Sequence, residues 1–274
     1  MKLGIASSVF VNYTLRDAIT HVAEAGYDGI DIWGGRPHVY RHDYSPKELK
    51  LVRKSLEDNH LTAISLMPAF YRYPYSLTSP NKVVRRDSIK YMKICIDNAE
   101  QLGVCTVLIV PTKSLHGQDP IKAWKHLAES IDELCRYAAQ YDLKLGLEVV
   151  NHFLTDLVNT AGEARRMLDE LHHQNLGIVL DTGHMNLGKE TTQEAIRKIS
   201  EYLLQVHVND NEGTTQLNLI PGDGTYNFNE LITVLRDIGY HGYLSAELGY
   251  QYTPDPDPAI RLTASRMREM MFDN

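Results

Sequence analysis

Four acidic or histidine side chains in the second half of the sequence could bind a metal ion. Each lies within or just after a short apolar segment: Glu148 in LEVVN, Asp181 in LDTGH, His207 in VHVND and Glu247 in AELGY. Carboxylate oxygens and imidazole nitrogens are common protein ligands of divalent metal ions. The residue types therefore predict a metal centre, provided that the fold brings the four segments to one place.

The charges of these groups favour the same interpretation. Three carboxylates that face one another away from water repel, so they either take up protons or bind a cation. A divalent ion bound by three carboxylates and a neutral imidazole leaves a net charge of about −1. We expect Mn²⁺, with Mg²⁺, Co²⁺, Ni²⁺, Fe²⁺ and Zn²⁺ as alternatives, because the donor set is oxygen-rich with one nitrogen. Taken singly, a strand glutamate is more often part of an ion pair and a lone histidine more often packs in the core, so the prediction depends on the four together.

Eight short segments rich in Val, Ile and Leu alternate with amphipathic helical patterns. Continuous apolar runs of this length are typical of parallel strands that are buried on both faces. The expected strands cover residues 3–7, 29–33, 62–66, 106–110, 144–150, 176–181, 203–209 and 243–248. The expected helices cover residues 15–26, 82–102, 120–140, 160–171, 191–200, 228–238 and 257–272, and one more begins at Ser45-Pro46. Thr14 is a suitable N-cap for the first helix, and Gly26, Gly103 and Gly239 are suitable helix stops.

Eight strand–helix units in 274 residues predict an α/β fold, a single (β/α)8 TIM barrel that forms one domain over residues 1–274. A doubly wound open sheet is the alternative, but it usually has a glycine-rich turn after the first strand, and SSVFVNYT contains no GxGxxG motif. Barrel active sites lie at the carboxyl ends of the strands. The fifth to eighth strands would therefore bring the four predicted ligands together above the barrel mouth.

The composition is that of an ordinary globular protein. Hydrophobic residues make up 43%, and 28 Lys and Arg stand against 35 Asp and Glu, for a net charge of −7. This acidic balance gives no electrostatic footprint for nucleic acid. No apolar run reaches the roughly 18 residues of a membrane helix, and the N-terminus lacks the features of a signal peptide. We therefore expect a cytoplasmic protein that binds neither nucleic acid nor membranes.

At these residues the sequence resembles the xylose isomerase-like barrel superfamily of sugar isomerases and epimerases. The resemblance covers the whole chain and is most specific at the predicted metal ligands, at DTGH (181–184) and at the glycine loop IPGDG (220–224). Within the superfamily, the chain is most similar to fructoselysine 3-epimerases and other ketose 3-epimerases. That similarity rests on GYDGIDIWGGRPHVY (26–40), YPYS (73–76), IPGDG and GYHGYLSAEL (239–248).

The resemblance implies a metal-dependent 3-epimerase of ketoses or fructosamine-type sugars, assembled as a dimer or tetramer. In such enzymes one glutamate removes the proton at C3, a cis-enediolate forms, and a second glutamate returns a proton on the opposite face. By position, Glu148 and Glu247 would be metal ligands and also this acid/base pair, whereas Asp181 and His207 would be ligands only. Inversion needs groups on both faces of the carbon, because a single base would tend to return its proton to the same side.

Other polar and aromatic residues are weaker candidates for the site. His184 would hold a substrate oxygen, with an ordinary loop histidine as the alternative. Asp210 could orient the imidazole of His207, although a turn aspartate is the simpler interpretation. Further candidate substrate contacts, each of which could equally be a packing or loop residue, are Trp33, Arg36, His38, Tyr75, His116 and His152.

Two positions depart from the pattern of ketose 3-epimerases and leave the substrate open. Many of these enzymes have a glutamate six residues after the strand-five glutamate, and they often have an arginine six residues after the strand-seven histidine. This sequence has Leu154 and Gly213 at those places.

Three other functions stay open at this point. An aldose–ketose isomerase or an inosose-type dehydratase could use the same barrel. An endonuclease of the apurinic-site type would need further histidines at the ends of the third and fourth strands, where the sequence has SLMP (65–68) and IVPT (109–112). A non-catalytic sugar-binding barrel would not need both Glu148 and Glu247.

Overall fold

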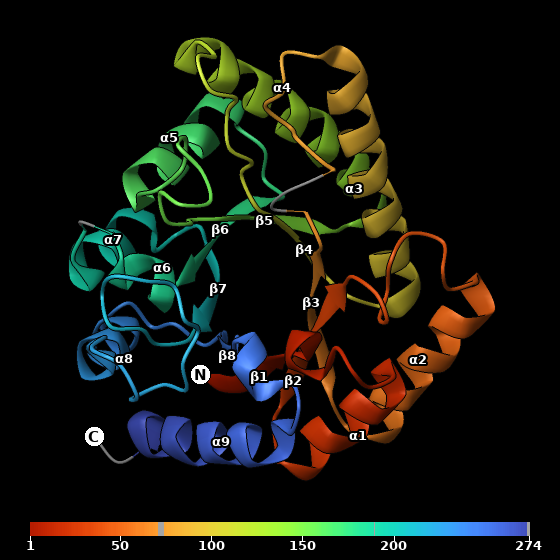
Figure 1. Cartoon of the computed structure of the whole chain (residues 1–274), viewed down its shortest axis with the longest axis vertical. Helices are drawn as coiled ribbons and strands as arrows, with labels where there is room; N and C mark the ends of the chain where they lie inside the picture. The colour runs from red at the N-terminus through yellow and green to blue at the C-terminus, as the bar shows by residue number, and fades with distance from the viewer. Residues whose placement is uncertain (71–73, 189, 273–274) are drawn as a thin grey trace.

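The computed structural model describes residues 1–70, 74–188 and 190–272. Eight parallel strands pair in chain order and β8 pairs with β1, so that the described strands close into a barrel inside a layer of helices (Figure 1). The strands are β1 (Lys2–Ala6), β2 (Gly29–Gly34), β3 (Thr62–Pro68), β4 (Thr106–Ile109), β5 (Lys144–Glu148), β6 (Leu176–Asp181), β7 (Leu203–Val208) and β8 (Tyr243–Ala246). The predicted (β/α)8 barrel is confirmed. The first residue of the YPYS segment, Tyr73, lies outside the described residues.

The helices also follow the predicted order. They are α1 (Leu15–Glu24), α2 (Pro46–Asp58), α3 (Lys82–Leu102), α4 (Pro120–Ala138), α5 (Ala161–Leu171), α6 (Thr182–Asn186), α7 (Thr192–Ile199), α8 (Phe228–Asp237) and α9 (Pro256–Phe272). Short 3₁₀ helices are η1 (Ser7–Phe10), η2 (Ala139–Tyr141) and η3 (Tyr250–Tyr252). The pattern did not predict α6, because its five residues are too few to show a helical period.

Capping side chains and left-handed glycines define the helix ends. The Thr14 side chain accepts a hydrogen bond from Asp17 N, and Ser45 forms a capping box with Glu48 at the start of α2. Gly103 adopts φ +74° at the end of α3, a conformation that favours glycine. These local choices are the ones that the sequence pattern predicted.

Two irregularities in strand register help to position the site. Between β6 and β7, Ile178 pairs with Leu203 but Val179 pairs with Gln205, so β7 contains one extra residue. Between β2 and β3, Ile30 pairs with Ala63 but Ile32 pairs with Leu66, so β3 contains an extra residue. Such bulges re-aim the side chains that follow them. No helix among the described residues has the length and apolarity needed to cross a membrane.

Candidate metal centre

The four predicted ligands lie together at the carboxyl end of the barrel. Glu148 and Asp181 are the last residues of β5 and β6, His207 lies near the end of β7, and Glu247 directly follows β8. One carboxylate oxygen or imidazole nitrogen from each lies within 4.8 Å of those of the other three. Glu148, Asp181 and His207 are buried and Glu247 is partly buried. The four side chains therefore form one compact cluster.

His207 stands between the two glutamates. Its Nδ1 lies 3.0 Å from Oε1 of Glu148 and 3.5 Å from Oε2 of Glu247. The two carboxylates reach this nitrogen from strands β5 and β8, on different parts of the barrel. Nδ1 is therefore the imidazole nitrogen that can share a bound ion with both glutamates.

Asp181 is held by contacts to its neighbours in β6, α6 and β7. Its Oδ1 accepts the backbone N–H of His184 at 2.8 Å and so caps α6, and its Oδ2 accepts Nδ2 of Asn209 at 2.6 Å. A Cβ at Gly183 would lie 1.9 Å from Oδ1 of Asn209, so only glycine allows this close approach. The DTGH segment thus fixes the orientation of one carboxylate of the cluster.

The buried charges strongly perturb one another. Burial, together with repulsion from Glu148, Asp181 and Asp31, raises the pKa of Glu247 to about 8, although His207 opposes the shift. Burial likewise raises the pKa of Asp181. For His207, burial lowers the pKa, but the hydrogen bond to Glu148 and the surrounding carboxylates outweigh it and raise the pKa to about 10. The cluster therefore needs positive charge among its carboxylates.

A divalent cation fits this donor set. Two ligands on opposite sides of an ion lie about 4.2 Å apart when each bond is about 2.1 Å long. The 4.8 Å spread of the four donor atoms is therefore within reach of small side-chain movements. Three carboxylates and one imidazole nitrogen are also donors that first-row divalent metals accept. A bound ion would relieve the repulsion among the carboxylates.

Comparison with known proteins gives a match over most of the chain. The family described as xylose isomerase-like TIM barrel matches residues 19–270. The chain belongs to this family.

Several known proteins match the chain nearly end to end. Over 271 residues the chain is 28% identical to fructoselysine 3-epimerase of Shigella flexneri, and the match covers 99% of this chain and 98% of that protein. The structure of D-psicose 3-epimerase with D-tagatose from Clostridium cellulolyticum H10 superposes with a TM-score of 0.83, 22% identity and 99% coverage of both chains. The structure of the IolI protein with a bound zinc atom gives a TM-score of 0.84, 22% identity and coverage of 100% and 99%. At such identities the two solved structures establish the fold alone.

In this family member, His184 lies beside the cluster. It is 7% exposed, and its Nδ1 lies 2.8 Å from Nδ2 of Asn151. The amide of Asn151 has a defined orientation, because its Oδ1 accepts the backbone N–H of Phe153 and its Nδ2 also donates to Oε1 of Gln216. Nδ1 of His184 must then accept, so the proton of a neutral His184 ring is on Nε2. His184 can therefore act as a hydrogen-bond donor through Nε2.

Two further candidates lie at the end of β2. Trp33 is partly exposed, and its ring meets that of His38 edge-on with centroids 6.1 Å apart. His38 is fully buried, and its Nδ1 lies 3.0 Å from Oγ of Ser7, which accepts the backbone N–H of Trp33. The hydroxyl proton of Ser7 is thus available to His38 Nδ1, an arrangement that suits a neutral imidazole.

The remaining candidates lie in other surroundings. Tyr75 is 4% exposed, stacks on Tyr91 with centroids 4.1 Å apart, and accepts a hydrogen bond from Arg41. Its ring therefore packs in an aromatic cluster instead of forming an exposed wall. Exposed loop or surface positions are occupied by Arg36, which pairs with Asp43, and by His116 and His152. Substrate contact by any of these residues stays a prediction.

Asp210 holds the glycine loop and does not orient His207. Its carboxylate accepts the backbone N–H groups of Asn211, Gly222, Gly224 and Tyr226. The turn interpretation of Asp210 is therefore the one that the structure supports. This loop also explains one departure from the epimerase pattern, because Gly213 has φ +78°, where a side chain would be strained.

The sequence analysis missed several polar residues around the cluster. They are Asp31, Asn151, Gln205, Asn209 and Gln216. Two of these residues could have been recognised from the sequence. Asp31 is a lone carboxylate inside the apolar segment GIDIW, and Asn209 lies two residues after His207, on the same face of an extended chain.

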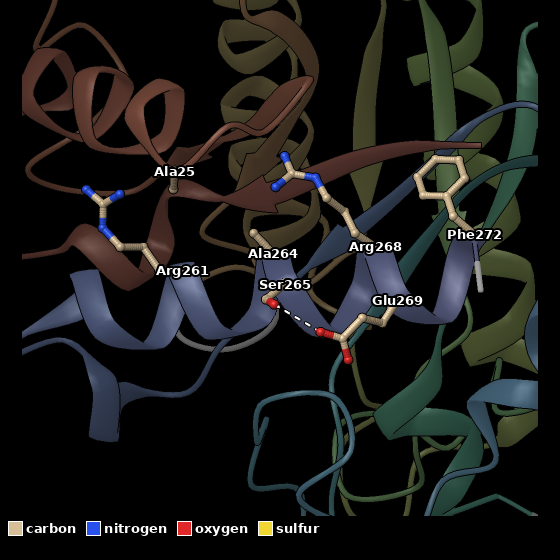
Figure 2. Close-up of a pocket in the computed structure, with 7 residues that line it drawn as sticks. All are labelled: Ala25, Arg261, Ala264, Ser265, Arg268, Glu269 and Phe272. Atoms are coloured by element: carbon tan, nitrogen blue, oxygen red, sulfur yellow. Dashed lines mark hydrogen bonds between the residues drawn. The ribbon is translucent and has the colours of Figure 1, made fainter.

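A surface pocket elsewhere on the barrel is separate from this centre. It lies between α9 and the turn after α1 (Figure 2), and its lining residues are Ala25, Arg261, Ala264, Ser265, Arg268, Glu269 and Phe272. Arg268 donates to the carbonyl of Gly26, and Ser265 donates to Glu269. None of the four clustered ligands lines this pocket.

Divalent metal should stabilise the fold, because it relieves the repulsion among the buried carboxylates. Ion at about a hundred times its dissociation constant adds about 2.7 kcal/mol to the free energy of unfolding, a rise of about 5–10 °C in melting temperature for a chain of this size. We expect Mn²⁺ to raise the melting temperature of chelator-treated protein by this amount in a thermal denaturation scan. Glu247→Gln should lose the rise, and Glu57→Gln, on the exposed face of α2, should keep it. An equal rise in Glu247→Gln would contradict the assignment of this ligand.

His38 should destabilise the protein in mild acid. Burial lowers the pKa of His38 from 6.5 to about 4. As the pH falls, the unfolded chain takes up this proton before the folded chain does. The folded state is therefore fully stable above pH 6.5 and loses stability as the pH falls toward 4. The loss in the free energy of unfolding is about 2 kcal/mol at pH 5. Urea unfolding in the presence of chelator should show a smaller loss of stability between pH 7 and pH 5 for His38→Gln than for wild type. The exposed control His116→Gln should retain the wild-type loss, and an unchanged loss in His38→Gln would refute the prediction.

Proposed function

We propose that the chain is a metal-dependent 3-epimerase of ketoses or ketose derivatives. The coarser part of this assignment, an isomerase that acts on sugars, has the support of the full-length similarity to fructoselysine 3-epimerase. The observation that carries the finer part is that two glutamates from different strands lie 3.0 and 3.5 Å from the same imidazole nitrogen. Two carboxylates from different strands can serve opposite faces of one carbon.

Glu148, Asp181, His207 and Glu247 would hold the metal ion. When bound, the ion supplies Lewis-acid stabilisation of the negative oxygen that develops beside the reacting carbon. We assign Mn²⁺ on the chemistry of the donor set, with Zn²⁺ and the other first-row ions as alternatives. The same four residues are those whose charges shift one another's pKa values, as described above.

Glu148 and Glu247 would move the protons. One carboxylate oxygen removes the C3 proton of the ketose, and the carboxylic acid of the other glutamate delivers a proton to the opposite face of C3. The two residues differ in exposure, since the side chain of Glu148 is 6% exposed and that of Glu247 is 27% exposed. Glu247 can therefore exchange its proton with solvent more readily than Glu148.

His184 would bind a substrate oxygen through Nε2–H. The Asn151 amide keeps Nδ1 of His184 as an acceptor, so the donor faces away from Asn151. Trp33, partly exposed at the end of β2, is the candidate apolar surface for the sugar ring. A dimer or tetramer stays an expectation.

Glu148→Gln and Glu247→Gln should each lower kcat by about 10³-fold or more, because each removes a proton-transfer group and a ligand. The measurement is NMR of candidate ketoses, their phosphates and fructosamines in D₂O, where wild type should place deuterium at C3 and keep the ketone at C2. Activity should disappear with chelator and return with Mn²⁺. Glu57→Gln serves as the surface control. Deuterium at C1 would indicate an aldose–ketose isomerase, loss of water a dehydratase, and binding without turnover a sugar-binding barrel; each of these would overturn the proposal.

Asn151→Ala should lower kcat/KM by about tenfold, the usual effect of losing one hydrogen bond that orients a group. Gln216→Ala keeps the hydrogen bond between Asn151 and His184 and should lower kcat/KM by no more than about threefold. Steady-state kinetics of the two variants would test the orienting role of Asn151. Equal losses would show that Asn151 has no special role.

A further inference from the structure

A fifth buried acidic residue lies behind His207. Asp31 of β2 is 0% exposed, and its Oδ2 lies 3.8 Å from Nε2 of His207, which is also 0% exposed. Nε2 has no hydrogen-bond partner among the residues that the structure describes. The imidazole therefore has the two glutamates at its Nδ1 edge and a carboxylate near its Nε2 edge.

Asp31 is held in place by three neutral donors from three other strands. Nε2 of Gln205 lies 2.9 and 2.8 Å from its two oxygens. The hydroxyl of Ser65 donates to Oδ1 and that of Ser245 donates to Oδ2. Strands β2, β3, β7 and β8 thus contribute one polar residue each to a network inside the barrel.

The irregular strand register fits this network. The extra residue of β3 lies between Ala63 and Leu66, where Ser65 turns toward Asp31. The extra residue of β7 directly precedes Gln205, which lies on the same strand face as His207. Bulges are common where a strand must re-aim a functional side chain.

A polar network at this depth needs a reason, because apolar side chains normally fill a TIM barrel. Burying a carboxylate without a basic partner is unfavourable, and the three donors to Asp31 are all neutral. His207 is the group that benefits. If its Nδ1 is to present a lone pair to an ion, a neutral ring must have its proton on Nε2, next to the negative charge of Asp31.

We propose that Asp31 is a positioning residue of the metal centre. It holds His207 in the tautomer and orientation that leave Nδ1 free to bind a divalent ion, and Ser65, Gln205 and Ser245 hold Asp31 for this purpose. The proposal rests on the metal centre of the proposed function and adds a residue that touches neither ion nor substrate.

The test is the affinity of the folded chain for Mn²⁺, measured on chelator-treated protein by competition with a fluorescent chelating indicator. Asp31→Asn should weaken Mn²⁺ binding by about 10- to 100-fold, the usual effect of removing a carboxylate behind a histidine ligand. Asp210→Asn is the matched control, because Asp210 is also 0% exposed and accepts several hydrogen bonds, but from loop amides. It should lower the melting temperature and change the Mn²⁺ affinity by less than about threefold. Wild-type affinity in folded Asp31→Asn, or an equal loss in Asp210→Asn, would overturn the proposal.

NMR of the wild-type imidazole tests the proposal even if Asp31→Asn does not fold. In the Zn²⁺-loaded chain, ¹⁵N spectra should show His207, identified by its absence in His207→Asn, with Nδ1 bound to metal and a proton on Nε2. The opposite arrangement would overturn the role of Asp31. If wild type bound Mn²⁺ tightly but turned over no ketose, the proposed function would fail and the role of Asp31 would stand. A wild-type chain that bound no divalent ion would overturn both.

Discussion

Buried negative charge is the constraint on which this site depends. Glu148, Asp181, Glu247 and Asp31 surround one imidazole, and of the four carboxylates only that of Glu247 reaches solvent appreciably. Carboxylates in such a small volume are stable only if positive charge lies among them. Protonation of His207 would supply part of this positive charge, but one proton balances only one of the carboxylates. A doubly charged ion neutralises more of the cluster at once.

The barrel meets this constraint with rigid elements. Parallel strands end at the same side, so residues far apart in sequence meet there without long loops. Two local features then adjust the side-chain positions. The bulge in β7 helps to aim His207 into the barrel, and the absence of a side chain at Gly183 allows Asn209 to reach Asp181. Both are features of the backbone, which positions the side chains that carry the donor atoms.

The sequence predicted the barrel and the meeting of the four ligands, because both follow from periodicity and from one geometric rule about strand ends. It did not predict which polar residues lie around them. Asp31 stands out in its apolar segment, but only the fold shows that it meets Gln205 of β7 inside the barrel. The sequence also did not show that the ring of Tyr75, a candidate substrate contact, stacks on Phe70 and Tyr91. Which aromatic rings pack together depends on tertiary contacts that no local pattern encodes.

Chemistry and substrate choice are separated in this architecture. The two glutamates proposed to move protons lie at strand ends, whose positions the barrel fixes, while most candidate sugar contacts lie outside the strands. The carboxylate of Asp210 accepts backbone N–H groups of the loop after β7, and Gly213 in that loop has a left-handed conformation that favours glycine. The hydrogen bond between Asn151 and Gln216 joins the loops after β5 and β7, and Asn151 also hydrogen-bonds to His184. The bridge orients His184 through residues that are not among the four clustered ligands, so its residues could differ without a change in the charge of the cluster.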